Sequence, residues 1–174
     1  MGKQERKGYA SGMAYDPRYI ANLILDRAAD RNIDLTNAEV NKIIYFLHAF
    51  YLAEFSQPLI DAKIEAWDYG PVVREVCSEF KSFGARPISR RAQRLDTRLL
   101  IRIDVYEEMA EQDFEFLAPI IDRLSNLGAS RLIGISHEKG GPWDIVYNRS
   151  GRVNPGMEIS DKIIREYYLQ QTRH

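Results

Sequence analysis

The stretch TNAEVNKIIYFLHAFYL, residues 36–52, decides how this chain folds. Thr36 is followed three residues later by Glu39, which is the capping-box pattern of a helix N-terminus. Behind this start, an unusually wide apolar stripe recurs at helical spacing: Val40, Ile43, Ile44, Leu47, Phe50, Tyr51 and Leu52. A helix with so wide an apolar face belongs in the interior of a domain. We therefore expect this helix at the centre of the core.

On the N-terminal side, Asp16-Pro17 joins a capping side chain to a proline at the first helical position. Apolar residues follow at helical spacing, so we expect a first helix through Ile20 and Ile24 to Ala28. Residues 1–14 hold three glycines and three basic residues and little that could be buried. We expect them to form a flexible leader.

On the C-terminal side, Gln57-Pro58 ends the central helix. Residues 63–67 alternate between polar and apolar side chains, which predicts a short strand. The sequence Tyr69-Gly70-Pro71 then predicts a turn, in which Gly70 can take a positive φ and Pro71 suits the first turn of a helix. We expect this third helix to run through residues 72–83 and to end at Gly84.

Residues 86–102 contain six arginines and one acid. Four of the arginines lie four residues apart, which suits a helix, but the β-branched residues that follow favour a strand over about 98–105 after a mobile basic loop. Residues 104–115 hold six acids. Two alternatives remain: the arginines are solvated or neutralised by these acids, or they form a docking face for an anion or a partner.

Three more helices follow in the sequence. We expect Asp113 to cap a helix that contains Pro119 and ends at Gly128. Ser130 is the expected cap of a short helix to Ser136, and Ser160 is the expected cap of the last helix. Residues 138–143 are expected to be turns. The sequence thus predicts a mainly α fold, about six helices with two or three short strands, in a single compact domain over residues 15–174.

Composition limits the function classes. Of the 174 residues, 24 are Lys or Arg and 25 are Asp or Glu, so the net charge of -1 excludes a strongly basic nucleic-acid-binding chain. The single cysteine, Cys77, cannot form an internal disulfide or a thiolate metal site. The N-terminus lacks the apolar segment of a signal peptide, and no stretch approaches the ~20 apolar residues of a membrane helix. We expect a cytoplasmic protein that contacts no membrane.

The residues that usually carry catalysis do not form a recognisable pattern. His48 lies in the most apolar helix, and His137-Glu138 has no second histidine at zinc-ligand spacing. A phosphate-binding glycine-rich loop and a nucleophile elbow are both absent from the sequence. We therefore predict no enzyme, no metal site and no cofactor.

Two aromatic turns are more informative. Trp67 and Tyr69 flank the turn before Gly70-Pro71, and Trp143 follows Gly141-Pro142. Rigidly held aromatic side chains are good interface anchors, and they are equally good core residues. Both alternatives stay open. With the basic run, the candidate partner-binding residues are Trp67, Tyr69, Arg86, Arg90, Arg91, Arg94 and Trp143.

These motifs together resemble one family, the Panacea domain of SocA-like antitoxins and phage-associated GepA-like proteins. Leu35-Thr36-Asn37, residues 41–46, residues 57–60 and the series IEAWDYGPVV at 64–73 carry the first part, and Ser136-His137 with Gly141-Pro142-Trp143 carries the second. The similarity extends from about residue 15 to residue 168. The positions matching the family pattern are Lys42, Tyr45, Pro58, Glu65, Trp67, Tyr69, Gly70, Pro71, His137, Pro142 and Trp143.

The resemblance implies an antitoxin of a two-gene toxin–antitoxin system. Such a protein neutralises its cognate toxin, encoded by the adjacent gene, by direct protein–protein binding. The basic stretch at 86–102 is outside the family pattern, so it is a candidate for partner specificity in this member. The alternative is a nucleic-acid-binding regulator of its own operon or of a mobile element, which would use the basic run and the N-terminal leader.

Overall fold

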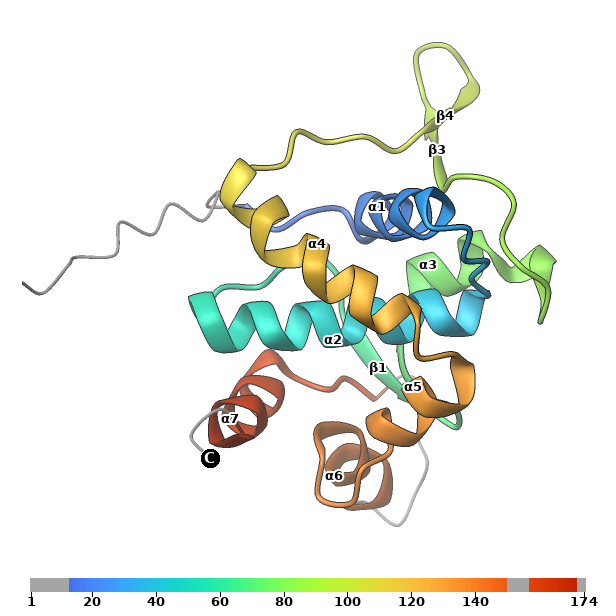
Figure 1. Cartoon of the computed structure of the whole chain (residues 1–174). Coiled ribbons are helices and arrows are strands. Elements are labelled where there is room, and N and C mark those ends of the chain that lie inside the picture. Colours follow the sequence, from blue (N-terminus) through green and yellow to red (C-terminus); the bar gives the residue numbers. More distant parts are fainter. Residues whose placement is uncertain (1–12, 150–156, 172–174) are drawn as a thin grey trace, which may run out of the picture.

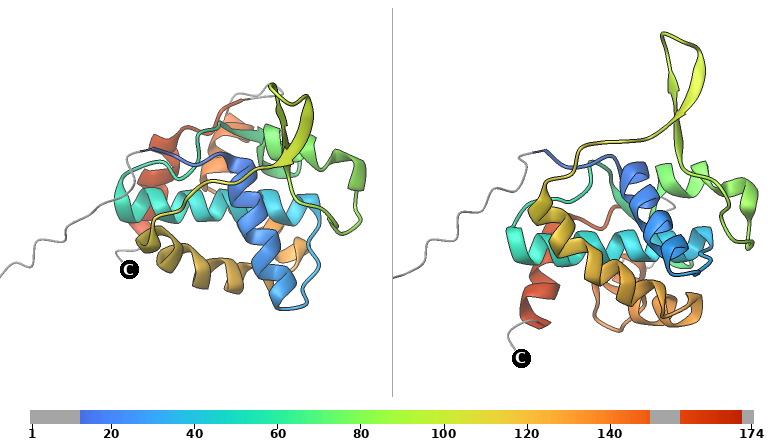
Figure 2. Two further views of the ribbon diagram at one scale, coloured as in Figure 1. Left: turned by 90° about the horizontal axis from the view of Figure 1, so that it is seen from above. Right: turned by 45° about the horizontal axis from the view of Figure 1, so that its top comes forward.

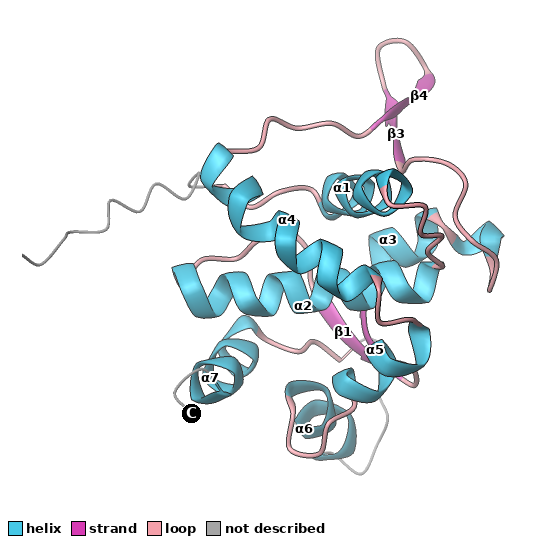
Figure 3. Cartoon of the chain, viewed as in Figure 1, coloured by secondary structure: helices cyan, strands magenta, loops and turns pink. Residues whose placement is uncertain are grey.

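The structure is a computed structural model that describes residues 13–149 and 157–171. Within these ranges the chain forms seven α-helices and two antiparallel two-stranded sheets (Figure 3). This confirms the prediction of a mainly α fold. The leader expected over residues 1–14 lies almost entirely outside the described residues. None of the helices in the described part is both long and apolar enough to span a membrane.

Helix α2 (Asn37–Phe55) lies at the centre of the molecule, as its apolar stripe predicts (Figure 1). Five helices of the described part pack against it: α1 (Pro17–Asp30), α3 (Arg74–Glu79), α4 (Glu111–Ser125), α5 (Ala129–Ser136) and α7 (Asp161–Gln171). The expected capping box is present, because Thr36 N–H donates to the Glu39 carboxylate at 2.8 Å and Glu39 N–H donates to the Thr36 hydroxyl at 3.4 Å. This cap fixes the start of the helix around which the domain is built.

The β1–β2 hairpin consists of β1 (Ile64–Trp67) and β2 (Gly70–Val73), with Asp68 and Tyr69 in the turn. The prediction that residues 72 and 73 begin a helix is wrong. Both are β-branched and pair with β1, and Val73 N–H donates to the Asn41 side chain at 3.0 Å. Pro71 therefore lies in a strand, where it is tolerated because β2 is an edge strand.

The third helix is short and begins after this strand. It comprises α3 (Arg74–Glu79), followed by the 3₁₀ turn η1 (Lys81–Phe83). It ends at Gly84, which has a φ of 58°, as expected from the sequence. On its other edge, β1 pairs with residues 157–159, where Ala66 N–H donates to the Met157 carbonyl and Ile159 N–H to the Ile64 carbonyl, each at 2.8 Å.

The basic segment forms a second hairpin, made of β3 (Gln93–Asp96) and β4 (Ile101–Asp104). It stands away from the helical body (Figure 2). Strand β4 falls within the predicted strand at 98–105, but β3 corrects the expectation of a loop before it. We refer to residues 93–104 as the β3–β4 hairpin.

The caps of the C-terminal helices differ from expectation. Helix α4 begins at Glu111, so the prediction of Asp113 as its cap is wrong. The Asp113 side chain is fully buried instead, where it accepts hydrogen bonds from the hydroxyls of Tyr15 at 2.7 Å and Tyr51 at 2.9 Å. Helix α5 begins at Ala129 after Gly128, so Ser130 is not a cap either.

Helix α6 (Pro142–Arg149) was not expected from the sequence, which predicted turns up to residue 143. Its start has the favoured proline at the first helical position. Ser160 precedes α7 as predicted, and its hydroxyl accepts a hydrogen bond from Ile163 N–H at 3.4 Å. These two helices lie on the same side of α2 as α5 (Figure 1).

Candidate functional site

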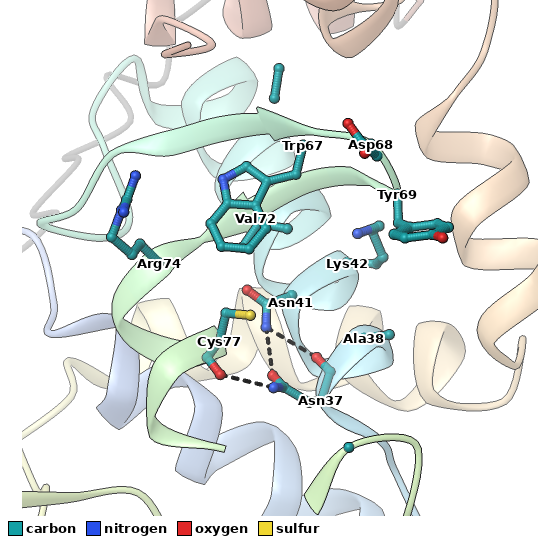
Figure 4. Close-up of a pocket in the computed structure, with 12 residues that line it drawn as sticks. Asn37, Ala38, Asn41, Lys42, Trp67, Asp68, Tyr69, Val72, Arg74 and Cys77 are labelled. Carbon is teal, nitrogen blue, oxygen red and sulfur yellow. Dashed lines mark hydrogen bonds between the residues drawn. The ribbon is translucent and has the colours of Figure 1, made fainter. Parts of the chain in front are cut away.

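A pocket of about 710 Å³ lies between the first half of α2, the β1–β2 hairpin and α3 (Figure 4). Its walls combine apolar and polar side chains from these three elements. The lining residues are Asn37, Ala38, Asn41, Lys42, Ala66, Trp67, Asp68, Tyr69, Val72, Arg74, Cys77 and Gly84. Because the hairpin turn contributes to it, the pocket opens beside one of the two aromatic turns that the sequence singled out.

Two asparagines fix the floor of the pocket. Asn41 donates to the Asn37 backbone carbonyl at 3.0 Å and to its side-chain oxygen at 2.9 Å, and its own side-chain oxygen accepts from Val73 N–H. Asn37 donates to the carbonyl of Cys77 at 2.9 Å. The bonds join β2 and α3 to α2, so the three walls of the pocket are held together by buried amides.

Lys42 is a lysine buried in the pocket wall, with only 2% of its surface exposed. Its Nζ donates to the carbonyl of Pro71 at 3.1 Å. Burial lowers the pKa of this ammonium to about 8, because the charged form loses solvation. No ion pair connects it to a carboxylate within residues 13–149 and 157–171.

Glu65 orients the tryptophan at the pocket edge. Its carboxylate accepts from the Trp67 indole N–H at 2.8 Å and from Arg74 through two bonds of 3.0 and 2.8 Å. Burial by itself raises the pKa of Glu65, but the bonds from Arg74 and Trp67 outweigh it and hold the pKa below its usual range. The Arg74 guanidinium lies 5.9 Å from the centre of the Trp67 ring system, a cation–π distance.

The second aromatic turn, which contains Trp143, contacts the first, which contains Trp67. The Trp143 indole N–H donates to the Trp67 carbonyl at 2.8 Å, and the rings of Trp143 and His137 are 3.9 Å apart. The His137 Nδ1–H donates to the carbonyl of Ile133 at 2.7 Å, which sets the orientation of the imidazole. The structure thus places the two sequence motifs, which are about 70 residues apart, in direct contact.

Gly70 lies where these motifs meet. Its φ is 101°, and a Cβ at this position would lie 2.8 Å from Lys42 Cε, 2.9 Å from Ser136 Oγ and 3.0 Å from His137 Cε1. Only a glycine satisfies both the backbone conformation and the close approach. The motif residues at 42, 65–71, 136–137 and 142–143 therefore form one cluster, whereas Tyr45 is buried further along α2 and Pro58 is exposed after its end.

The candidate partner-binding aromatics differ in exposure. Tyr69 is 78% exposed at the hairpin turn and Trp67 is half-buried, so both have side-chain surface open to solvent. Trp143 is only 6% exposed, which places it in the core, one of the two alternatives that the sequence left open. It supports Trp67 from behind.

Four of the six arginines of the basic run form ion pairs or hydrogen bonds with other described residues. Arg90 and Arg102 both bind Glu79, at 2.6 and 2.8 Å, and Arg91 pairs with Asp26 and Asp104. Arg86 donates to the backbone carbonyls of residues 82 and 83. Among the described residues, only Arg91 forms an ion pair with an acid of the 104–115 segment. The acids of that segment therefore neutralise few of these arginines.

The other two arginines, Arg94 and Arg98, are exposed on the β3–β4 hairpin and form no ion pair within the described part of the chain. Both lie in the basic stretch at 86–102 that the sequence singled out for partner specificity. The role of the Asn37–Asn41 pair was missed, although two amides at helical spacing on an otherwise apolar face were a usable signal.

The residue types that usually carry catalysis have defined surroundings in the described part of the chain. Among the residues that the structure describes, no group of three or more His, Cys, Asp or Glu side chains could hold a metal ion. Glu138 bonds to the Tyr167 hydroxyl at 2.7 Å, while His137 is turned towards Ile133 and Trp143. The Ser136 hydroxyl lies 3.4 Å from His137 Nδ1, and both groups donate to the Ile133 carbonyl.

Comparison with known proteins finds a matching family model and a similar protein. The family model described as antitoxin SocA-like, Panacea domain, matches residues 40–144. The chain is 33% identical over 157 residues to Antitoxin SocA of Caulobacter vibrioides (strain NA1000 / CB15N), covering 90% of this chain and 84% of that protein. No solved structure gives a significant match.

Proposed function

Because the chain belongs to the Panacea-domain family of SocA-like antitoxins, we propose that it is an antitoxin that neutralises a protein toxin by binding it directly. The observation that carries the proposal is a concentration of exposed apolar side chains on the β3–β4 hairpin. Leu95, Leu99, Leu100 and Ile101 are each more than half exposed. Clustered exposed apolar residues mark interaction surfaces.

The base of this hairpin is firmly anchored. The buried side chain of Asn22 accepts from Ala92 N–H at 2.6 Å and donates to the carbonyls of Ala92 and Val105, both at 3.0 Å. Glu79 adds the bonds from Arg90 and Arg102 described above. The amide of Asn22 thus adds to the backbone bond of 3.0 Å from Val105 N–H to the Ala92 carbonyl, where the hairpin leaves the body.

The tip of the hairpin, in contrast to its anchored base, is exposed to solvent. Leu100 is 78% exposed and has a positive φ of 55°, which is uncommon for a leucine. Arg94 and Arg98 are exposed on the same hairpin, and neither forms an ion pair within the described residues. A fixed base with an exposed leucine and arginine tip suits insertion into an apolar groove of a toxin bordered by acidic side chains.

The experiment that tests the proposal uses the product of the adjacent gene. We expect that protein to arrest growth when expressed alone, and co-expression of the present chain to restore growth and yield a complex that co-elutes. Absence of both arrest and complex would overturn the antitoxin proposal. Salt-dependent binding to upstream DNA would then support the regulator instead.

The hairpin is tested separately by introducing a negative charge at its tip. Leu99→Glu is expected to weaken the complex by ~10-fold or more, because it places a carboxylate where an apolar side chain is buried. Ile135→Glu is the matched control, since Ile135 is an exposed aliphatic residue on α5, on the far side of α2 from the hairpin (Figure 1). Equal binding by both variants would remove the hairpin from the interface.

To test the arginines, the substitutions must leave the ion pairs at the base of the hairpin intact. Substituting Arg90 or Arg91 would also disturb the anchored base, since both form ion pairs with the body. The double variant Arg94→Ala/Arg98→Ala leaves the base intact. We expect it to slow association with the toxin and to reduce the salt dependence of that rate.

A further inference from the structure

We propose that the pocket between α2 and the β1–β2 hairpin binds a carboxylate of the partner toxin, with Lys42 as the group that pairs with it. The inference rests on the proposed function and adds a second contact, of different chemistry, to that of the β3–β4 hairpin. It follows from a cavity that holds a buried cation with which no carboxylate of the described residues forms an ion pair.

The first step is the hydrogen-bonding capacity of Lys42. An ammonium group has three N–H donors and no acceptor. The structure assigns one donor to the Pro71 carbonyl, and the side chain lines the pocket. In Figure 4 the amine lies between Trp67 and Tyr69, beneath the hairpin. Two donors thus remain for a group that enters the cavity.

The second step is the charge around this amine. Besides Lys42, the charged residues that line the pocket are Asp68 and Arg74. Asp68 lies in the exposed turn and accepts from the Tyr147 hydroxyl at 2.9 Å, whereas Arg74 is bound to Glu65. The acids near the pocket are therefore engaged elsewhere, and an entering carboxylate would supply the missing counter-charge to a buried cation.

The third step is the character of the walls. Trp67, Val72, Ala66 and Ala38 give the pocket an apolar lining. The Trp67 ring is fixed by Glu65 from one side and its backbone by Trp143 from the other, so little ordering is needed on binding. The occupant is therefore a carboxylate flanked by an apolar side chain. An aspartate, a glutamate or the C-terminus of the toxin supplies this chemistry.

The test compares Lys42→Met with Lys81→Met. Methionine keeps an unbranched chain that can lie against Gly70, while Lys81 is an exposed lysine whose loss changes the net charge equally. We expect Lys42→Met to weaken toxin binding by ~10- to 100-fold, and Lys81→Met to bind as the wild type does. Equal affinities of all three proteins would overturn the pocket inference and leave the antitoxin function standing.

Toxin variants identify the source of the carboxylate. Each acidic residue is changed to its amide, and a separate variant extends the C-terminus by Gly-Ser. The responsible change is expected to weaken binding to the wild-type antitoxin and to have little effect on binding to Lys42→Met. Additive effects for every toxin variant would contradict a carboxylate in this pocket.

A measurement on the isolated protein keeps the inference testable if no toxin binds or if Lys42→Met fails to fold. N-acetylphenylalanine and its amide are titrated into the wild-type chain, and the indole N–H signal of Trp67 is followed by NMR. We expect the acid to shift this signal at least several-fold more strongly than the neutral amide does. Equal shifts, or no shift from either compound, would overturn the proposal.

Discussion

Trp143 donates its indole N–H to the backbone carbonyl of Trp67 at 2.8 Å, across 76 positions of sequence. The bond joins helix α6 to the end of β1 and connects the two aromatic motifs. Trp143 also stacks on Tyr147 with ring centroids 4.5 Å apart, and Tyr147 in turn donates to Asp68 in the hairpin turn. The pocket wall thus depends on a helix that lies outside the pocket.

Trp143→Phe is expected to lower the free energy of unfolding by about 1–3 kcal/mol, because it removes a part-buried hydrogen bond and some of the packed ring area. Urea unfolding measures the change. Tyr147→Phe removes only the exposed hydroxyl bond to Asp68, and we expect a change within about 0.5 kcal/mol. A Trp143→Phe variant as stable as the wild type would show that the two motifs do not support one another.

Gly70→Ala is expected to destabilise the protein by about 2 kcal/mol or more. The added Cβ would lie within 3.0 Å of Lys42, Ser136 and His137, at a φ of 101°. Gly134→Ala on helix α5 is the matched change, because no atom lies within 4 Å of its added Cβ. There we expect a gain of about 0.5–1 kcal/mol from helix propensity. The melting temperature should therefore fall for Gly70→Ala and rise for Gly134→Ala, relative to the wild type.

Asp113→Ala is expected to cost about 2–4 kcal/mol, because it leaves the buried hydroxyls of Tyr15 and Tyr51 without their common acceptor. Glu115→Ala removes the same charge from an exposed position on the same helix and should change stability by less than about 0.5 kcal/mol. Denaturant titrations of the two variants separate the buried carboxylate from a general charge effect. Equal stabilities would contradict this role for Asp113.

Lys42→Met is expected to be more stable than the wild type at neutral pH, by about 3 kcal/mol at most, because the folded state holds the ammonium in a poorly solvated site. The pKa of Lys42 is about 8 when folded, against an ordinary value of 10.5. Between these values the unfolded chain binds more protons, so wild-type stability rises with pH and the advantage of Lys42→Met shrinks. A difference that stays constant from pH 7 to 10.5 would contradict the lowered pKa.

Much of the fold could be read from local patterns. The capping box at Thr36, the apolar stripe behind it and Asp16-Pro17 all led to helices that the structure contains. These signals involve residues only a few positions apart, so they can be recognised in the sequence without knowledge of the tertiary structure. The family motifs likewise identified most of the residues that surround the pocket.

The failures occurred where a distant partner outweighed a local preference. Residues 72 and 73 form a strand because β1 and Asn41 offer partners for their backbone, and Asp113 is turned inward because two tyrosine hydroxyls meet it there. In the basic segment, residues 93–96 form a strand where a loop was expected, because β4 pairs with them and the Asn22 amide holds the base of the hairpin.

The sequence by itself thus determined the central helix, the mainly α class and the motifs that define the family. The tertiary structure alone decided that these motifs converge on one pocket, that Lys42 is buried there without a carboxylate from the described residues, and that leucines and arginines are exposed together on the β3–β4 hairpin. The physical reason is that helix caps and apolar periodicity are properties of neighbouring residues, whereas burial and charge pairing are set by groups brought together from distant parts of the chain.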